Sequence, residues 1–395
     1  MDQHDLRAEL LPFDGTAPLS TGVPAGRAPR GARILYVVPP SPSFAGVERV
    51  IHDVANAISA RPDNPFAVSV LYFSEYAALG QERIRYEPII KKAGRLRQTT
   101  AVLRKLLRER RFDLVIVPQV EASTFAAAAL PPRGTRMVVY LHGNPWVERT
   151  RSLQSRSLFL LFRLLAVRRY HGAFAVTPTL AREFQQAHPS LREACWVPNP
   201  VRRFRERRDD GPRGRGSVTF LNVGRLSFQK GQDILLQAFA EVHVRRPRTR
   251  LVIVGHGAMQ EELDARIAEL GLQRAVEIRS MPTNPGPAFA EADVFVSSSR
   301  WEGWSLVIVE ALSFGLPVVA TDCDFGPRDI LTDPRLGCLV SNGDVAALAD
   351  AMVARCDGAV EEAMEDAAFR EEHAAGFRIE NVVTAHMDAI RAMVA

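Results

Sequence analysis

Several features that define whole classes of protein are missing from this sequence. Its four cysteines contain no C-x-x-C pair and have no histidine at metal-binding spacing. This argues against a disulfide framework and a structural zinc site, and it favours a reducing compartment. The first residues do not follow the charged-then-apolar order of a secretory signal. No apolar run approaches the ~20 residues of a membrane-spanning helix. We therefore expect a cytoplasmic protein, either soluble or peripheral on the inner face of the plasma membrane.

Motifs for other common chemistries are also absent. There is no G-x-x-x-x-G-K-[ST] segment, which disfavours a P-loop ATPase, and Gly255-His256-Gly257 lacks the third glycine of a dinucleotide fingerprint. Asp322-Cys323-Asp324 has the form of a metal-binding pair but no further ligands near it. A net charge of +5 is too small to indicate nucleic acid. The expectation is no metal, no organic cofactor and no nucleic-acid partner.

The positive charge is concentrated in two segments. Lys and Arg far outnumber acids over residues 91–111 and again over 146–170, and the second segment also carries a run of Leu and Phe. A basic helix with an apolar face can lie on an anionic membrane surface. The same pattern also fits a solvated helix whose leucines belong to the core. The sequence leaves both interpretations open.

At 395 residues, the chain is long enough for two domains of ordinary size. Short apolar strands alternate with helices from residue 33 and again from 218, a pattern typical of parallel sheets covered on both faces. The predicted fold is α/β, with two tandem doubly wound Rossmann-like domains facing a central cleft. We expect the chain to be divided into a disordered tail (1–32), an N-terminal domain (33–200), a charged linker (201–217), a C-terminal domain (218–378) and a final helix that packs back on the first domain (379–395).

Ligands of doubly wound sheets bind beyond the carboxyl ends of the strands. The strongest candidate motif at such a position runs from Glu302 to Glu310. Its helix is apolar nearly all round, so Glu310 should be buried and in need of a partner. The two carboxylates are separated by roughly 12 Å of helix rise, about the distance from a sugar to the ribose in a nucleotide sugar. The backbone amides of Gly303–Leu306, which include Trp304 and Ser305, would face a phosphate. The alternative is an ordinary helix-start acid followed by a structural glutamate.

Three further loops carry candidate groups. Gly224 allows a ligand to approach the backbone, and Arg225 with Lys230 places two cations where a departing diphosphate gains charge, although they also fit a plain surface loop. Gly46 begins a helix and could cradle phosphate. His142, after a buried strand, is either a proton-transfer or sugar-binding group or a core histidine.

Together these motifs resemble glycosyltransferase family 4, the retaining enzymes of the GT-B fold, from about residue 33 to 345. The match is most specific at Gly224-Arg225-Leu226 with Lys230-Gly231 and at Glu302-Gly303 through Glu310. The resemblance implies that Gly224-Arg225-Leu226 and Lys230-Gly231 bind the pyrophosphate of a nucleotide sugar. It implies that Glu302 and the amides after it hold the donor sugar, and that Glu310 holds the ribose.

The resemblance assigns three more positions. It places Gly46 near the phosphates, His142 near the sugar, and the backbone of Ile278 and Arg279 beside the base. Acceptors are bound by the N-terminal domain in this family. The sequence departs from the family pattern at three positions: Ala45 replaces a glycine, Trp304 a common Phe, and Asp329 a common Glu.

Residues 284–285, 322–323 and 326–330 look like those of bacterial members that build surface polysaccharides such as lipopolysaccharide. The resulting prediction is a retaining transferase that moves a hexose or N-acetylhexosamine from a UDP-sugar to a saccharide or polyprenyl-linked saccharide. A GDP-mannose-dependent mannosyltransferase is an alternative. So are a GT-B epimerase or phosphorylase and, in another class, a noncatalytic protein that binds nucleotide sugars.

Overall fold

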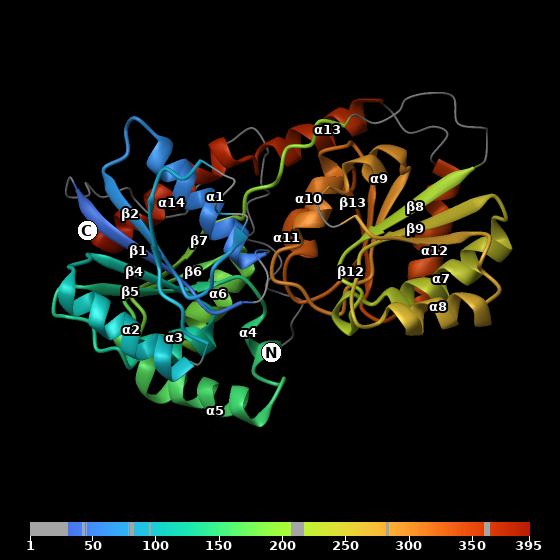
Figure 1. The fold of residues 1–395 in the computed structure, drawn as a ribbon. Coiled ribbons are helices and arrows are strands. Elements are labelled where there is room, and N and C mark those ends of the chain that lie inside the picture. The colour runs from blue at the N-terminus through green and yellow to red at the C-terminus, as the bar shows by residue number, and fades with distance from the viewer. Residues whose placement is uncertain are drawn as a thin grey trace.

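The computed structural model describes residues 31–395 except positions 42, 43, 45, 78, 80–82, 95, 207–216, 282–283 and 359–363. The predicted tail therefore lies almost wholly outside the described residues. Within them the chain forms two α/β domains that lie side by side (Figure 1). Each contains a parallel sheet with helices on both faces, so the predicted fold of two doubly wound domains is confirmed.

The N-terminal sheet has seven parallel strands in the order β3-β2-β1-β4-β5-β6-β7. Its central strands are built from Val, Ile and Leu, and β4 is buried along its whole length. The strands are β1 (Ala32–Val38), β2 (Phe66–Tyr72), β3 (Glu87–Ile90), β4 (Leu114–Pro118), β5 (Arg136–Leu141), β6 (Gly172–Ala175) and β7 (Glu193–Trp196). The edge strands β3 and β7 were not expected from the sequence, because each is only four residues long and incompletely buried.

The helices of this domain are α1 (Val47–Ala60), α2 (Leu96–Glu109), α3 (Val120–Ala127), α4 (Pro145–Glu148), α5 (Leu153–Leu161) and α6 (Pro178–Ala187). After α5 the chain continues through a π-helical turn, η3 (Phe162–Ala166), and a 3₁₀ turn, η4 (Val167–Arg169). In α1 the buried side chains Val50, Ile51, Val54 and Ile58 recur at helical spacing and pack onto the sheet.

The C-terminal sheet has six parallel strands in the order β10-β9-β8-β11-β12-β13. The strands are β8 (Val218–Val223), β9 (Thr249–Val254), β10 (Val276–Arg279), β11 (Val294–Ser297), β12 (Val318–Asp322) and β13 (Gly337–Ser341). The helices are α7 (Gln232–Arg245), α8 (Gln260–Glu269), α9 (Gly286–Glu291), α10 (Leu306–Leu312), α11 (Pro327–Ile330), α12 (Val345–Gly358) and α13 (Met364–Ala375), with a 3₁₀ turn η5 (Phe228–Lys230). Each strand lies where an apolar run in the sequence predicts one.

The chain crosses between the domains twice, and the two crossings are paired. The outward crossing is the start of the predicted linker, where the Val201 amide donates to the Phe377 carbonyl at 2.8 Å on the return crossing. Two residues of this crossing are packed, since Val201 is buried and Phe204 contacts the rings of Phe289 and Phe314. Positions 207–216 of the linker lie outside the described residues.

The return crossing leads into α14 (Ile379–Val394), which packs against α1, β4 and β5 of the first domain. Its side chains Val382, Val383, Met387, Ile390 and Met393 are buried there. The last helix therefore completes the N-terminal domain (Figure 1). Within the described part of the chain, no helix has both the length and the hydrophobicity needed to cross a bilayer.

Candidate active site

An ion pair between two loops of the C-terminal domain forms the centre of the predicted site. Lys230 Nζ lies 2.5 Å from Oε1 of Glu302, and the Ser299 hydroxyl donates to the same oxygen at 2.7 Å. Lys230 follows β8 and Glu302 follows β11, which are neighbouring parallel strands. Their carboxyl ends therefore meet at one edge of the sheet. Glu302 is only 5% exposed, and a carboxylate buried to that degree needs such partners.

Arg225 lies on the rim of this pair. Its guanidinium donates to the Gln229 side chain at 3.4 Å, and Gln229 in turn donates to the Trp301 carbonyl at 3.1 Å. Gly224 packs against the Lys230 side chain, which would lie 3.3 Å from a Cβ at this position. Arg225 itself is exposed and available to an incoming anion.

Glu310 has a different partner from the one that its place in the motif suggests. The carboxylate is 2% exposed, and its Oε1 accepts from Arg202 Nε at 2.9 Å, a residue of the outward crossing. Its Oε2 is buried without a hydrogen-bond partner among the described residues. Burial raises the pKa of this carboxyl, and Arg202 partly offsets the effect. Glu310 is thus joined to the interdomain crossing rather than to Lys230 or Arg225.

Gly303 is the point where the site meets the N-terminal domain. A Cβ here would lie 2.2 Å from the carbonyl oxygen of His142 and 2.6 Å from Cα of Gly143. Only a glycine allows this approach, because real Cβ contacts of that length do not occur. The strand β5 ends one residue before His142, so its carboxyl end faces the loop that follows β11.

The His142 ring is enclosed at this junction. Its centroid lies 3.8 Å from that of Tyr140, and both ring nitrogens are buried without a hydrogen-bond partner in the part of the chain that the structure describes. Burial lowers the pKa of His142 to about 3, with nearby His386 adding to the effect. The imidazole is therefore neutral at pH 7, with two unused polar atoms.

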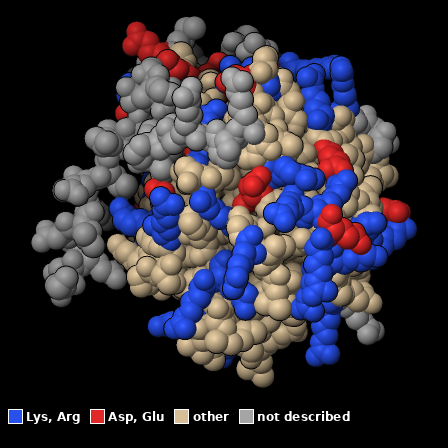
Figure 2. Space-filling model, turned by 90° about the vertical axis from the view of Figure 1, so that its left-hand side faces the viewer, with Lys and Arg blue, Asp and Glu red and all other residues tan. Residues whose placement is uncertain are grey.

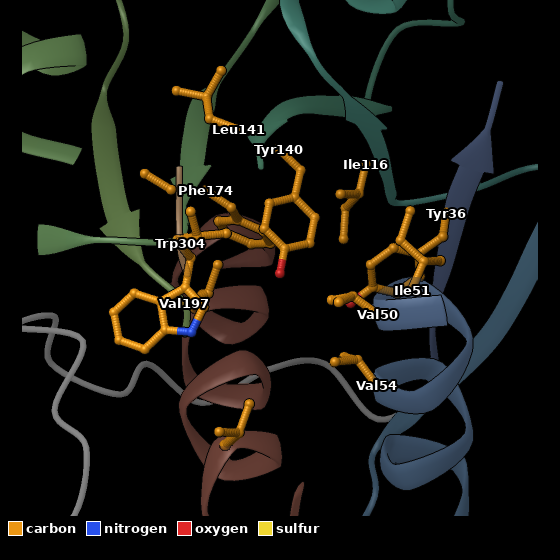
Figure 3. Close-up of a cluster of buried hydrophobic side chains, with 14 of the residues drawn as sticks. Tyr36, Val50, Ile51, Val54, Ile116, Tyr140, Leu141, Phe174, Val197 and Trp304 are labelled. Atoms are coloured by element: carbon orange, nitrogen blue, oxygen red, sulfur yellow. The ribbon is translucent and has the colours of Figure 1, made fainter. Parts of the chain in front are cut away.

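Trp304 was predicted to bind the donor, but its side chain has another place. The indole is 6% exposed, and its ring lies 5.0 Å from that of Phe377 within the apolar cluster that includes Tyr140 and Phe174 (Figure 3). Its indole Nε1 is buried without a hydrogen-bond partner among the described residues. The amide of Leu306 donates to the Trp304 carbonyl at 3.1 Å, and the binding of a ligand by the amides of residues 303–306 stays a prediction. Ser305 has a buried hydroxyl without a partner among the described residues.

The remaining predicted positions offer backbone rather than side chains. Gly46 precedes α1 with φ of 56°, and a Cβ there would meet open space. Ile278 and Arg279 end the edge strand β10. The Arg279 guanidinium is bound by Glu277 at 2.9 Å and by Glu291 at 2.6 Å. Its side chain is therefore already neutralised.

Two hydrogen bonds that the sequence did not suggest connect the domains around the site. Asn144, which caps α4, donates to Asp324 Oδ2 at 3.0 Å, and the Thr179 amide donates to Asp329 Oδ1 at 3.3 Å. Asp329 also accepts from the Gly326 amide at 3.1 Å. The sequence had drawn attention to Asp329 through the likeness of residues 326–330 to polysaccharide-building enzymes, and to Asp324 only as part of a segment with the form of a metal-binding pair. These bonds hold the two domains against each other.

The Asp322-Cys323-Asp324 segment is occupied by these structural contacts. Asp322 accepts from Arg328 at 2.9 Å, and Asp324 accepts from Asn144. Among the residues described, no three His, Cys, Asp or Glu side chains gather as metal ligands would.

The close approach at Gly303 leads to a first prediction. In Gly303→Ala the new methyl group meets the His142 carbonyl, so we expect the domains to move apart at a cost of about 1–3 kcal/mol. Small-angle X-ray scattering should show a larger radius of gyration, and the melting temperature should fall. Gly94→Ala is the matched control, because a Cβ at Gly94 meets nothing within 4 Å. Equal radii for Gly303→Ala and the wild type would contradict the contact.

Comparison with known proteins agrees with this geometry. The family described as Glycosyltransferase Family 4 matches residues 44–203, and the family described as Glycosyl transferases group 1 matches residues 217–357. The first match falls on the N-terminal sheet and its helices, and the second falls on the sheet that carries Lys230 and Glu302. The gap between the two matches coincides with the interdomain linker.

Curated relatives match over parts of their length. An uncharacterized glycosyltransferase of Methanocaldococcus jannaschii is 29% identical over 60% of this chain and 62% of its own. The N-acetylgalactosamine-N,N'-diacetylbacillosaminyl-diphospho-undecaprenol 4-alpha-N-acetylgalactosaminyltransferase of Campylobacter jejuni is 36% identical over 30% of this chain and 32% of its own. The chain thus aligns with less than two thirds of each of these proteins.

Solved structures match over nearly the whole molecule. Anabaena HepE in complex with UDP and glucose superposes with a TM-score of 0.72 at 21% identity, covering 90% of this chain and 98% of HepE. At that identity the likeness shows the fold alone. With both halves matched by glycosyltransferase families and the two domains arranged as in these structures, the chain is a glycosyltransferase of the GT-B type.

Proposed function

We propose that this enzyme moves a hexose or N-acetylhexosamine from a UDP-sugar to a saccharide or lipid-linked saccharide, with retention of the anomeric configuration. The observation that carries the proposal is the Lys230–Glu302 pair, set where Gly303 meets His142 of the other domain. Lys230 there is a cation that suits a diphosphate, and Glu302 beside it is a carboxylate that suits the hydroxyl groups of a sugar. The Campylobacter relative, by its name, transfers N-acetylgalactosamine to a diphospho-undecaprenol-linked acceptor, and HepE was solved with UDP.

The roles of the side chains follow from their charges. Lys230 and Arg225 would stabilise the negative charge that develops on the departing diphosphate. Glu302 would accept hydrogen bonds from hydroxyls of the donor sugar, and neutral His142 would offer a ring nitrogen to the same sugar. No described side chain is assigned as a nucleophile, so we favour a front-face displacement. The acceptor oxygen bonds to the anomeric carbon, the bond to the diphosphate breaks with its electron pair, and the hydroxyl proton passes to the diphosphate.

The nucleoside would lie along the same edge of the C-terminal sheet. The free Oε2 of Glu310 is a buried acceptor that costs about 1–3 kcal/mol when unpaired, and a ribose hydroxyl would satisfy it. Arg202 keeps the other oxygen paired. The base would stack near the backbone of Ile278 and Arg279. GDP-mannose is the alternative donor.

The test of the donor is a thermal-shift panel of UDP-, GDP- and ADP-sugars. Binding to the native state raises the melting temperature, and we expect the UDP-sugars to raise it most. A larger shift with GDP-mannose would favour a mannosyltransferase. If the protein binds a donor but releases no nucleoside diphosphate from it, it is a noncatalytic binding protein. An inverted anomeric centre in the product, seen by NMR, would reject retention.

Substitution of the central cation tests the site. We expect Lys230→Ala to lower kcat by at least about tenfold, because one charge contact to the leaving group is lost. Steady-state release of nucleoside diphosphate measures this. Lys105→Ala, in an exposed pair with Glu109 on α2, is the control that should keep wild-type turnover. Wild-type kinetics in Lys230→Ala would remove this residue from the site.

The outer surface of the N-terminal domain suits a lipid-linked acceptor. Lys and Arg predominate over acids on the face that Figure 2 shows. The leucines Leu153, Leu160, Leu161, Leu164 and Leu165 on α5 and η3 are all exposed, from 44% to 79%. They are therefore not core residues, which favours the membrane interpretation of this segment. Beside them lies a groove of about 500 Å³, with Trp146, Phe159 and Phe184 on its walls and Arg149, Arg156 and Arg163 around it.

Flotation with lipid vesicles tests this surface. We expect the protein to float with vesicles of phosphatidylcholine and phosphatidylglycerol, and less with phosphatidylcholine alone, because exposed arginines favour anionic lipid. Replacing Leu164 and Leu165 with Ser should reduce the bound fraction by about half or more, by loss of buried apolar area. Val244→Ser, at an 82% exposed position on α7, is the control. Complete absence of flotation would contradict the membrane surface.

A further inference from the structure

A strained residue lies at the carboxyl end of β4. Gln119 follows this strand with φ of 61° and ψ of 153°, a backbone conformation that side-chain-bearing residues rarely adopt. It stands at the switch point of the sheet, where β1 and β4 are neighbours and their connections leave in opposite directions. Its side-chain oxygen is buried and has no hydrogen-bond partner among the described residues. The residue therefore costs stability in two ways.

A second costly residue lies next to it. Glu148, at the end of α4, is 7% exposed, and the cation nearest to it is Arg151 at 3.9 Å, too far for a hydrogen bond. Burial raises the pKa of Glu148 to about 7; Arg151 opposes this rise and Glu121 of α3 adds to it. Neutral His142 is the titratable group at the end of the neighbouring strand β5.

Both side chains converge on Gly143, beside the donor site. A Cβ at Gly143 would lie 2.6 Å from Glu148 Oε1 and 3.5 Å from Gln119 Nε2. Gly143 is also the residue whose Cα meets Gly303, directly after Glu302. A carboxylate and an amide of the N-terminal domain therefore stand one glycine away from the loop proposed to hold the donor sugar.

We propose that Gln119 and Glu148 form the subsite that binds the hydroxyl groups of the acceptor sugar. This inference rests on the proposed function. A carboxylate accepts hydrogen bonds from two neighbouring hydroxyls, and an amide both donates and accepts, so the pair suits a sugar with adjacent free hydroxyls. Acceptor binding would satisfy the unpaired amide oxygen and the poorly paired carboxylate. They act as positioning residues, which place the attacking hydroxyl against the anomeric carbon.

The position of Glu148 implies a dependence of acceptor binding on pH. The carboxylate form accepts more hydrogen bonds than the protonated form, so acceptor affinity is greatest above pH 7 and declines as pH falls through about 7. The charged groups that face it are Arg151, which opposes the rise in the pKa of Glu148, and Glu121, which adds to it. The KM for the acceptor should therefore rise on acidification, while the KM for the donor should not follow the same curve.

The experiment compares Glu148→Gln with the wild type. Octyl glycosides of glucose, galactose, mannose and N-acetylglucosamine serve as acceptors, with the UDP-sugar that gives the largest thermal shift as donor. We expect the acceptor KM to rise about tenfold or more, as for the loss of a charged hydrogen-bond partner, and its pH dependence to vanish. Because Glu148 faces the acceptor and not the donor, the donor KM should change much less than the acceptor KM. Glu109→Gln, on the exposed face of α2, is the matched control.

Stability separates this role from a structural one. A carboxyl whose folded pKa is raised loses stability as pH rises from its unfolded value near 4 to about 7. The Glu148→Gln side chain does not ionise, so this variant keeps the free energy of unfolding that the wild type loses. At pH 8 its melting temperature should therefore be higher than that of the wild type by roughly 2 °C. Gln119→Gly, which relieves the strained backbone, should also melt higher while weakening acceptor binding.

Each outcome has a clear meaning. Lower melting temperatures for both variants, or an unchanged acceptor KM in Glu148→Gln, would overturn the subsite while leaving the transferase intact. Failure of the wild type to transfer to any glycoside of the panel would overturn the assignment to acceptor sugars. A wild type that binds no nucleotide sugar would instead remove the proposed function itself.

Discussion

The contact between Gly303 and the backbone carbonyl of His142 sets the geometry of the whole molecule. Because no side chain fits between these two chain segments, the loop after β11 lies directly on the loop after β5. That contact brings Glu302, Lys230 and Ser299 of one domain beside His142, Gly143 and Glu148 of the other. The bonds from Asn144 to Asp324 and from Thr179 to Asp329 hold the same arrangement from the sides. The groups proposed to bind the donor and those proposed to bind the acceptor therefore lie at one junction.

Within that junction, charge is balanced in different ways in the two domains. In the C-terminal domain the buried carboxylates of Glu302 and Glu310 have cations as partners, Lys230 and Arg202 respectively. In the N-terminal domain the polar atoms of Gln119, His142 and Glu148 are left unpaired or poorly paired. A folded protein gains nothing from such groups on its own, so their presence is best explained by a ligand that supplies the missing partners.

Much of this arrangement could be predicted from the sequence, and what escaped prediction has physical causes. The C-terminal strands follow from their apolar runs, and Lys230 and Glu302, 72 positions apart, both follow strands whose carboxyl ends meet. The edge strand β3 was missed because Glu87-Pro88-Ile89-Ile90 gains its structure from pairing with β2, not from burial. The pairing of Arg202 with Glu310 depends on how the two domains meet. The positive φ of Gln119 has no sequence signal, since glycine would normally mark it.

The paired crossings at Val201 and Phe377 carry a consequence for biosynthesis. Because α14 packs against α1, β4 and β5, the core of the first domain stays incomplete until α14 has been synthesised. The C-terminal domain, contained within one stretch of chain, can fold before that moment. The half of the enzyme that is translated first is therefore the half that is finished last.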